Sequence, residues 1–461
     1  MEPNPAEPNP AEPNPAEPNP AGSSSARISR PPTTTLSEED QRELDERIGL
    51  LAEAFADAGH RFFLVGGLVR DALLGRGLTG DIDITTDAGP DRIAQLLADW
   101  ADTIWDQGKS FGTVGARRAD TTVEITTHRA ESYDSESRKP DVRFSCDITT
   151  DLARRDFAVN AMAVEMPGWT LLDPFGGRED LANGVLRTPS EPEGLFSDDP
   201  LRMLRAARFC SQLSLSPAPE LVAAVRSVRP RLAIVSRERI ATELTKLLEL
   251  PSVAAGATFL VETDLLGDLV PGWRDGDAKA SAAALDSLGD LSDRVPARWA
   301  ILLGPVCDDA EAARCMRKLR IKGATISTTR SILRAARAAE AAYADAAAAD
   351  GADAKRWLPA VRRLVADHGS RLDAALVVLR AWDCPLSEPF DARLAEVRAS
   401  EGEALRRLPV DGHRVMEVLG TSGSAVGAAL AWLRERQIEL GPLNPEQACA
   451  LLGEWDRQRQ T

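Results

Sequence analysis

Two neighbouring segments decide the fold of this 461-residue chain: Phe62-Phe-Leu-Val-Gly-Gly-Leu-Val-Arg-Asp71 and Asp81-Ile-Asp-Ile84. The short apolar run 62–65 predicts a buried strand. Gly66 and Gly67 end that strand, and because they lack a Cβ they let backbone N–H groups approach an anion. Arg70 follows three residues later, where it is placed to reach a phosphate oxygen from the start of a helix. The first segment therefore predicts a phosphate cradle.

The second segment reads as an alternating strand. Because side chains on a strand alternate with a period of two, Asp81 and Asp83 fall on the same face. A double glycine alone usually marks a turn, and an Asp-x-Asp alone is usually a solvated strand edge. Two carboxylates next to a phosphate cradle, however, predict a metal-dependent site of phosphoryl or nucleotidyl transfer.

The bulk composition is that of a globular protein, with 43% hydrophobic and 27% charged residues. No apolar run approaches the roughly 20 residues of a membrane span, and no secretory signal is recognisable. The six cysteines form no CxxC pair, which argues against zinc and a disulfide scaffold and predicts a reducing cytoplasm. A net charge of −16 does not exclude an RNA partner, because a basic groove can exist on an acidic molecule.

The composition changes along the chain. The first 21 residues repeat Ala-Glu-Pro-Asn-Pro and predict a disordered tail. Short β-rich runs alternate with helical stretches up to about residue 166, and the remainder reads as helical. We therefore expect an α+β protein with five regions: a tail at 1–35, an α/β head at 36–166, a helical neck at 167–260, a helical body at 261–365 and an RNA-binding helical tail at 366–461. Strands are expected at 62–65, 82–85, 122–127 and 157–165.

Three features downstream of the opening motif have two interpretations each. Glu124, in a predicted strand, either adds a third carboxylate to the metal site or is an ordinary exposed strand residue. His128 is expected to be structural or on the surface rather than a catalytic base. The polar, aperiodic stretch 130–143 predicts a loop, which next to an active site is either a lid or a simple connector.

Arginines dominate two further segments. Residues 151–161 hold two arginines, two aspartates and an asparagine around an apolar centre, a set that suits a triphosphate and a ribose. In the second segment Asp199, Arg202, Arg205 and Arg208 recur every three residues, so they share one side of a helix. Such a row is either a solvated charged face or an array of donors and acceptors that reads the edge of a base.

Taken in this order, the motifs resemble those of the class II tRNA nucleotidyltransferases, the CCA-adding enzymes, and the related bacterial poly(A) polymerases. The resemblance covers about residues 60–250 and implies a polymerase-β-like nucleotidyltransferase head. It implies that Asp81 and Asp83 bind two Mg²⁺ ions, that Gly67 and Arg70 contact the triphosphate, and that Arg155 contacts the incoming nucleotide. Gly66 is included in the expected nucleotide-binding set, and Glu124 in the expected catalytic set.

The same resemblance identifies the helix at 199–208 with the family's amino-acid template, which selects CTP and ATP without a nucleic-acid template. Ser236-Arg-Glu-Arg-Ile240 resembles the last shared motif of the neck, and 410–455 resemble the tail with lower specificity. The template here begins Asp198-Asp199 where the family usually has Glu-Asp. No histidine precedes an aspartate, so no phosphohydrolase activity is expected in 260–400.

The implied function is addition of CMP and AMP to the 3′ end of tRNA. Poly(A) tailing of RNA and addition of A alone remain open, whereas the presence of 130–143 argues against addition of CC alone. Other classes are disfavoured: a decayed, non-catalytic head would not keep the intact motif, and a small-molecule transferase would not need the template-like helix. The sequence does not predict the oligomeric state.

Overall fold

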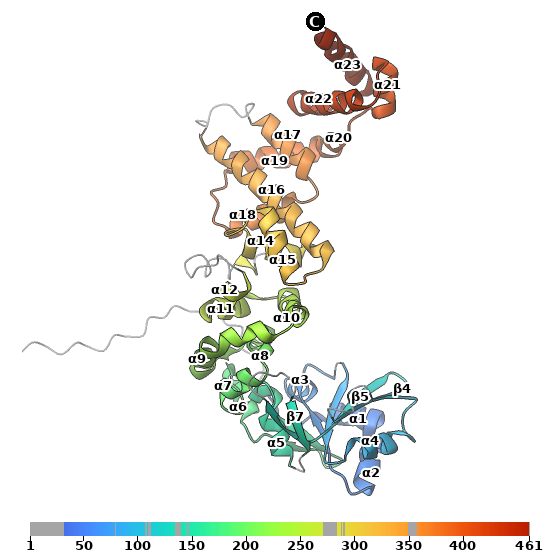
Figure 1. Cartoon of the computed structure of the whole chain (residues 1–461), viewed down its shortest axis with the longest axis vertical. Coiled ribbons are helices and arrows are strands. Elements are labelled where there is room, and N and C mark those ends of the chain that lie inside the picture. Colours follow the sequence, from blue (N-terminus) through green and yellow to red (C-terminus); the bar gives the residue numbers. More distant parts are fainter. Residues whose placement is uncertain are drawn as a thin grey trace, which may run out of the picture.

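Figure 1 shows an elongated molecule, with a mixed α/β head at one end and helices stacked from it to the C-terminus at the other. The computed structural model describes residues 32–78, 80–106, 108, 112–133, 140–144, 147–270, 284–286, 288, 291–348 and 357–460. The predicted disordered tail lies almost wholly outside these ranges. The expectation of an α/β head followed by a long helical arm is confirmed.

The head is built on a seven-stranded sheet in the order β3-β4-β5-β2-β1-β8-β9. All neighbouring strands are antiparallel except β2 and β5, which run parallel. The central strand β1 is buried along its whole length, as its apolar sequence predicts. The strands are β1 Phe62–Val65, β2 Ile82–Thr86, β3 Thr103–Trp105, β4 Thr113–Arg118, β5 Thr121–Thr127, β8 Ala163–Met166 and β9 Thr170–Leu172.

Short helices connect and cover the strands of the head. The first helix begins after Ser37, whose side chain accepts a hydrogen bond from the backbone N–H of Asp40 and so caps the helix. The helical segments of the head are α1 Glu38–Leu44, η1 Asp45–Gly49, α2 Leu50–Asp57, α3 Gly67–Leu73, α4 Pro90–Leu97, α5 Ile148–Ala153 and η3 Ala158–Asn160.

Two predictions of local structure need correction. The strand expected at 157–165 is wrong in its first half, where Ala158–Asn160 forms a 3₁₀ turn. The side chain of Asn160 donates to Asp156 and accepts from Arg70, and such side-chain bonds favour a turn over a sheet ladder. The loop expected at 130–143 is also wrong in part, because its flanks pair as the antiparallel strands β6 Arg129–Tyr133 and β7 Pro140–Phe144. The centre of that segment, 134–139, lies outside the described residues.

Beyond the head the chain is helical apart from one short ladder, β10 Val185–Leu186 with β11 Ser216–Pro217. Nearest the head lie α6 Gly177–Asn183, α7 Pro192–Asp198, α8 Leu201–Gln212, α9 Pro219–Val228, η4 Arg229–Ile234, α10 Arg237–Glu249, α11 Ala254–Glu262 and α12 Leu265–Leu269. Further along lie α14 Arg294–Leu303, α15 Asp309–Lys318, α16 Gly323–Ala348, α17 Leu358–His368, α18 Leu372–Ala381, α19 Glu388–Ser400 and α20 Gly402–Arg406. The last three helices are α21 Gly412–Leu419, α22 Ser424–Leu440 and α23 Pro445–Gln460.

One apolar core runs from the head through the helices up to Leu405. A separate apolar cluster, centred on Val415, Leu433 and Leu452, holds α21, α22 and α23 together. No helix within the described ranges combines the length and the apolar character needed to cross a membrane. The exact limits proposed from the sequence for head, neck, body and tail stay predictions.

Candidate active site

Three carboxylates lie side by side on one face of the head sheet. Asp81 directly precedes β2 and Asp83 lies within it; both side chains are exposed, while Ile82 and Ile84 are buried. The alternation predicted from the sequence is therefore present. Glu124, on the parallel strand β5, is the register partner of Asp83 and is exposed on the same side. The sheet register thus places a third carboxylate next to the pair.

The electrostatics of this group suit a bound cation. Although the residue is exposed at the surface, surrounding protein atoms desolvate the carboxyl group of Asp83 and raise its pKa; the charge of Arg155 opposes that rise, and the nearby charges of Glu124 and Asp81 add to it. A divalent cation would relieve this repulsion, and carboxylate oxygens are the ligands that Mg²⁺ prefers. Among the described residues no group of three or more His, Cys, Asp or Glu is arranged to hold a metal ion. A site with two carboxylates fits Mg²⁺ nonetheless, because that ion commonly takes its other ligands from water and substrate phosphates.

A glycine separates the carboxylates from an arginine. Gly66 adopts φ +76°, a backbone conformation that L side chains rarely take, and α3 begins directly after it. A Cβ built on Gly66 would lie 3.4 Å from Nη1 of Arg155 and 3.6 Å from Oδ2 of Asp83. The absence of a side chain therefore keeps open the space between a cationic and an anionic group, as a phosphate-binding turn requires.

Arg155 is held in place by an aspartate that is not one of the three carboxylates described above. It follows α5, and its Nη2 donates to Oδ2 of Asp151 at 3.2 Å. Burial would raise the pKa of Asp151, but the charges of Arg155 and Arg154 outweigh that effect and lower it. Arg155 itself is only partly buried, and its Nε has no hydrogen-bond partner in the described part of the chain. The Nη1 of this guanidinium borders the space at Gly66, so Arg155, fixed through Nη2, is suited to contact a ligand there.

Arg70, expected to contact the triphosphate, is 4% exposed. Its guanidinium donates from Nε and Nη2 to the carboxylate of Asp71 and from Nη1 to Oδ1 of Asn160 at 2.6 Å. Gly67 lies against it, because a Cβ built there would come 3.4 Å from Nη2 of Arg70. In the ligand-free protein Arg70 therefore ties α3 to the segment after α5, and its direct contact with a nucleotide stays a prediction.

The row of charged residues on α8 is not a solvated face. Arg202 is 9% exposed and donates to the backbone carbonyls of Leu195 and Arg154. Asp199, just before α8, accepts from the backbone N–H of Leu201 at 3.2 Å and from Nη2 of Arg239 at 3.0 Å. The solvated interpretation of this row is wrong, and its role in reading a base stays a prediction.

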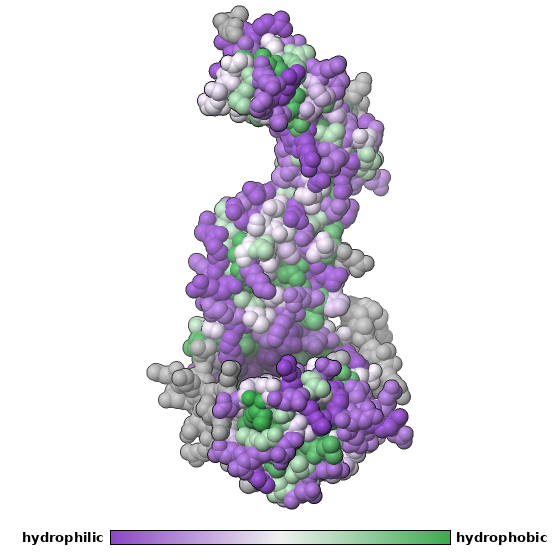
Figure 2. Space-filling view, turned by 90° about the vertical axis from the view of Figure 1, so that its right-hand side faces the viewer, coloured by the Kyte–Doolittle hydropathy of each residue, from purple (hydrophilic) through white to green (hydrophobic). Residues whose placement is uncertain are grey.

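The other two arginines of the row join the head to the helical arm. Arg205 pairs with Asp156 of the head at 2.6 Å, and Arg208 pairs with the buried Glu243 of α10 at 2.8 Å. Burial would raise the pKa of Asp156, but Arg205 and the bond from Asn160 lower it. Figure 2 shows a hydrophilic recess between the head, at the bottom of the view, and the helices above it.

His128 is structural rather than superficial. It is fully buried, its Nδ1 lies 2.8 Å from the hydroxyl of Thr85, and burial lowers its pKa, which disfavours the charged form. Sequence reasoning missed Arg239 and Glu243 as neighbours of the template-like helix. The one signal in the sequence was that they lie in or just after the motif that begins at Ser236. That motif does not indicate that Arg239 contacts Asp199 or that Glu243 contacts Arg208.

Several known proteins are similar in sequence to the part of the chain that contains this site. Residues 62–187 match the poly(A) polymerase head domain, and 214–276 match a domain described as the probable RNA and SrmB-binding site of polymerase A. The CCA-adding enzyme of Geobacillus sp. (strain WCH70) is 40% identical over 261 residues, 55% of this chain and 61% of that protein. The Bacillus subtilis CCA-adding enzyme is 41% identical over 218 residues, 47% of this chain and 53% of that protein.

Residues 62–187 and 214–276 are therefore similar to the head and RNA-binding domains of poly(A) polymerases, and the sequence is similar to that of CCA-adding enzymes. A solved structure of the Bacillus stearothermophilus CCA-adding enzyme in complex with CTP is 28% identical, with a TM-score of 0.65, and the match covers 90% of this chain and 98% of that one. In sequence the chain matches only about three fifths of the length of the first curated relatives. The match to the solved structure with CTP extends over both the head and the helical arm.

Proposed function

We propose that this protein adds CMP and AMP residues to the 3′ end of tRNA, using CTP and ATP, without a nucleic-acid template. The observation that supports this most is the space at Gly66, bordered by Asp83 on one side and Arg155 on the other. The family's relatives are CCA-adding enzymes, and one of them is solved with CTP. A tRNA substrate implies a cytoplasmic protein, and the described cysteines are unpaired, as a reducing compartment requires.

In this mechanism the 3′-hydroxyl oxygen of the RNA attacks the α-phosphorus of the nucleotide. The new bond joins that oxygen to phosphorus, the bond to the β-phosphate oxygen breaks, pyrophosphate leaves, and the hydroxyl proton passes to solvent. Asp81 and Asp83 would hold Mg²⁺, which when bound supplies activation of the hydroxyl and neutralisation of the leaving group. Glu124, the register partner of Asp83, would add negative charge beside that cation, and Arg155 would offset triphosphate charge from Nη1, which borders the space at Gly66.

The arm supplies choice of base and acceptor. We assign base selection to Asp199 and Arg202 at the start of α8. Their acceptors and donors would pair with the edge of cytosine or adenine in place of their present partners, Arg239 for Asp199 and two backbone carbonyls for Arg202. Poly(A) synthesis is the second candidate function, because the matching head domain carries that description. The two candidates share the same chemistry and differ in the acceptor and in the nucleotides that they use.

Replacement of Asp81 or Asp83 by Ala tests the proposal. Each variant should lose nucleotide addition to tRNA transcripts while still binding the RNA, since the carboxylates serve the chemistry. Asp120→Asn is the matched control, because Asp120 is an exposed aspartate on the turn between β4 and β5 of the same sheet. Full activity in either alanine variant would refute the metal-ligand assignment.

A further inference from the structure

One row of residues crosses the head sheet from its edge to the candidate metal site. Strand register pairs each member with the next over the four adjacent strands β3, β4, β5 and β2. Register partners on neighbouring strands point to the same face of a sheet. The hydroxyls of Thr113 and Thr126, two residues along β4 and β5, lie 2.9 Å apart on that face. The row therefore stands on the face of the carboxylates, and its members are Trp105, Gly115, Glu124 and Asp83.

The indole of Trp105 extends from the sheet edge toward the carboxylates. A Cβ built on Gly115 would lie 2.1 Å from both Cε2 and Nε1 of Trp105, so the ring occupies the space where a side chain on β4 would stand. Gly115 is buried, whereas Trp105 keeps part of its surface exposed. Because neighbouring strands are about 4.8 Å apart, this space lies about 5 Å from the backbone of Glu124 and about 10 Å from that of Asp83. An aromatic surface therefore stands within the length of one nucleoside of the metal site.

The two sides of the carboxylates differ. On the side of β1 the same face of the sheet is covered, because Phe63 and Val65 pack there against Leu152 of α5. The space at Gly66, which we propose as the site of the nucleotide's phosphates, lies on that side, directly after β1. On the other side, β5 and β4 lead to Trp105. The indole thus lies across the carboxylates from the proposed phosphate site.

The geometry of nucleotidyl transfer indicates which substrate meets Trp105. The attacking and leaving oxygens stand on opposite sides of the phosphorus, roughly in line. With pyrophosphate leaving toward Gly66, the 3′-hydroxyl approaches from β5 and β4, and the base on that terminal ribose falls near Gly115. An exposed cation, Arg117, follows two residues later on the same face. An aromatic ring beside a cation is the combination with which proteins hold single-stranded nucleic acid.

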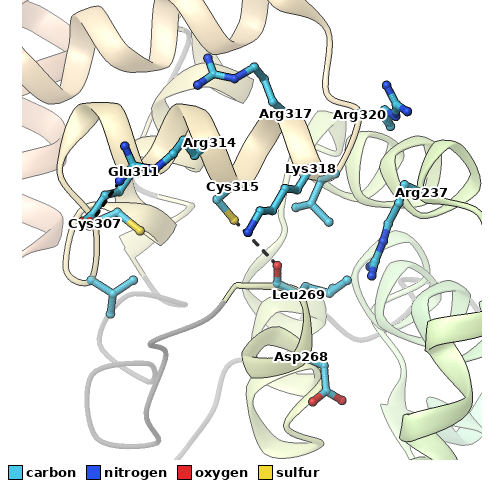
Figure 3. A pocket seen from close by; sticks show the side chains of 12 residues that line it. Arg237, Asp268, Leu269, Cys307, Glu311, Arg314, Cys315, Arg317, Lys318 and Arg320 are labelled. Atoms are coloured by element: carbon cyan, nitrogen blue, oxygen red, sulfur yellow. Dashed lines mark hydrogen bonds and ion pairs between the residues drawn. The ribbon is translucent and has the colours of Figure 1, made fainter.

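The basic cavity farther along the arm does not supply this contact. It has a volume of about 670 Å³ and lies between α10, α12 and α15, where cations of the run 314–322 stand opposite Arg237. Figure 3 shows Lys318 of α15 and Arg237 of α10 extending into the space between the two helices. Its described lining residues all belong to the helical arm, and some fall in 214–276, the region similar to an RNA-binding domain. A contact that orients the 3′-terminal nucleotide must come from a group closer to the carboxylates.

We infer that Trp105 binds the acceptor: its indole stacks on the base of the 3′-terminal nucleotide and so holds the attacking hydroxyl at the carboxylates. The inference rests on the proposed function and deepens it, because it assigns a subsite to the last base of the acceptor. Stacking tolerates any base, since every base has a π-face. One aromatic surface can therefore serve an acceptor that ends in the discriminator base, the first C or the second C, as successive additions require.

Removal of the ring and removal of the base test the contact from both sides. Trp105→Leu keeps an apolar side chain and Trp105→Phe an aromatic one, and Trp105→Thr, which suits a strand, repeats the test if the leucine variant does not fold. Trp169→Leu is the matched control, because Trp169 is likewise partly exposed but lies on the turn between β8 and β9, at the opposite edge of the same sheet.

The acceptors are an RNA hairpin that ends in CC and the same hairpin whose 3′-terminal ribose carries no base. Steady-state addition of AMP and binding by fluorescence anisotropy are measured for every pair of protein and acceptor. With the complete hairpin, Trp105→Leu should lower kcat/KM and raise Kd by about tenfold, whereas Trp105→Phe should stay within about threefold of the wild type. With the abasic hairpin, the wild type should show a similar loss and Trp105→Leu less than about twofold more, because the two removals delete one contact.

KM for ATP in each variant, and every value for Trp169→Leu, should change less than about twofold. An equal loss in Trp105→Leu with both acceptors would overturn the inference, since it would show a structural role for the ring. A raised KM for ATP with unchanged acceptor binding would also overturn it, in favour of stacking on the incoming nucleotide. If the wild type adds nothing to the complete hairpin, the proposed function fails, while the anisotropy comparison still tests the stacking.

Discussion

Gly66→Ala should abolish most of the nucleotide addition at a smaller cost in stability, because we propose that a substrate phosphate binds in the space beside Gly66. An alanine at φ +76° and ψ −140° stands in a backbone region that is nearly restricted to glycine, which costs about 1–3 kcal/mol in the free energy of unfolding. The new methyl group would also stand 3.4 Å from Nη1 of Arg155 and 3.6 Å from Oδ2 of Asp83. A phosphate bound between these groups would have to move by about 1 Å, a displacement that costs about a hundredfold in rate.

Gly59 provides a matched control for the strain alone. It has the same φ of +76°, is exposed, and has no atom within 4 Å of a built Cβ. Urea denaturation and single-turnover addition of CMP to a tRNA transcript would be measured for both alanine variants. Both variants should be less stable to urea than the wild type, and only Gly66→Ala should add CMP more slowly. Near-wild-type rates in Gly66→Ala would refute the reasoning, as would an equal loss of rate in Gly59→Ala.

Three further predictions concern the arm and the metal. Arg239→Gln should change the free energy of unfolding by less than about 1 kcal/mol relative to the wild type, because the ion pair with Asp199 is partly exposed. The same variant should incorporate GTP and UTP more often, measured as kcat/KM relative to that for CTP and ATP. Asp156→Asn should cost about 2–3 kcal/mol in urea denaturation, since it weakens a buried ion pair with Arg205. The folded-state pKa of Asp156 lies below the ordinary value of 3.8, so the contribution of this carboxylate to stability is present above that value and is lost as pH falls through the lower folded-state pKa. The wild type and the Asn variant should therefore begin to converge in stability as pH falls below 3.8. Chelation of divalent cations with EDTA should stop nucleotide addition, and Mg²⁺ should restore it; undiminished activity in EDTA would contradict the carboxylate assignment.

Local periodicity explains what the sequence predicted well. The position of Asp81 and Asp83 on one face follows from a period of two, and the buried strand at 62–65 from its apolar run. The turn at Gly66 likewise follows from a residue that tolerates positive φ. Each of these features depends on interactions within a few residues, so it could be predicted without knowledge of the rest of the fold.

Features that depend on tertiary contacts could not be predicted. Glu124 stands beside Asp83 because of the register of two parallel strands, which no local pattern specifies. The burial of Arg70 depends on Asn160, 90 positions away, and the bond between Arg239 and Asp199 on the packing of α10 beside α8. The basic run at 314–322 is visible in the sequence, but its position opposite Arg237 is not. Polar residues also concealed β6, and in β7 the alternation of Pro140, Val142 and Phe144 with charged residues is too short to stand out from the polar segment before it.

One measurement tests the central claim most directly. A tRNA transcript that ends at its discriminator base would be incubated with Mg²⁺ and with labelled CTP and ATP, separately and together, and the products resolved at single-nucleotide resolution. The proposal predicts two additions with CTP alone, three with both nucleotides, and then a stop. A long ladder with ATP alone would contradict it and identify a poly(A) polymerase instead.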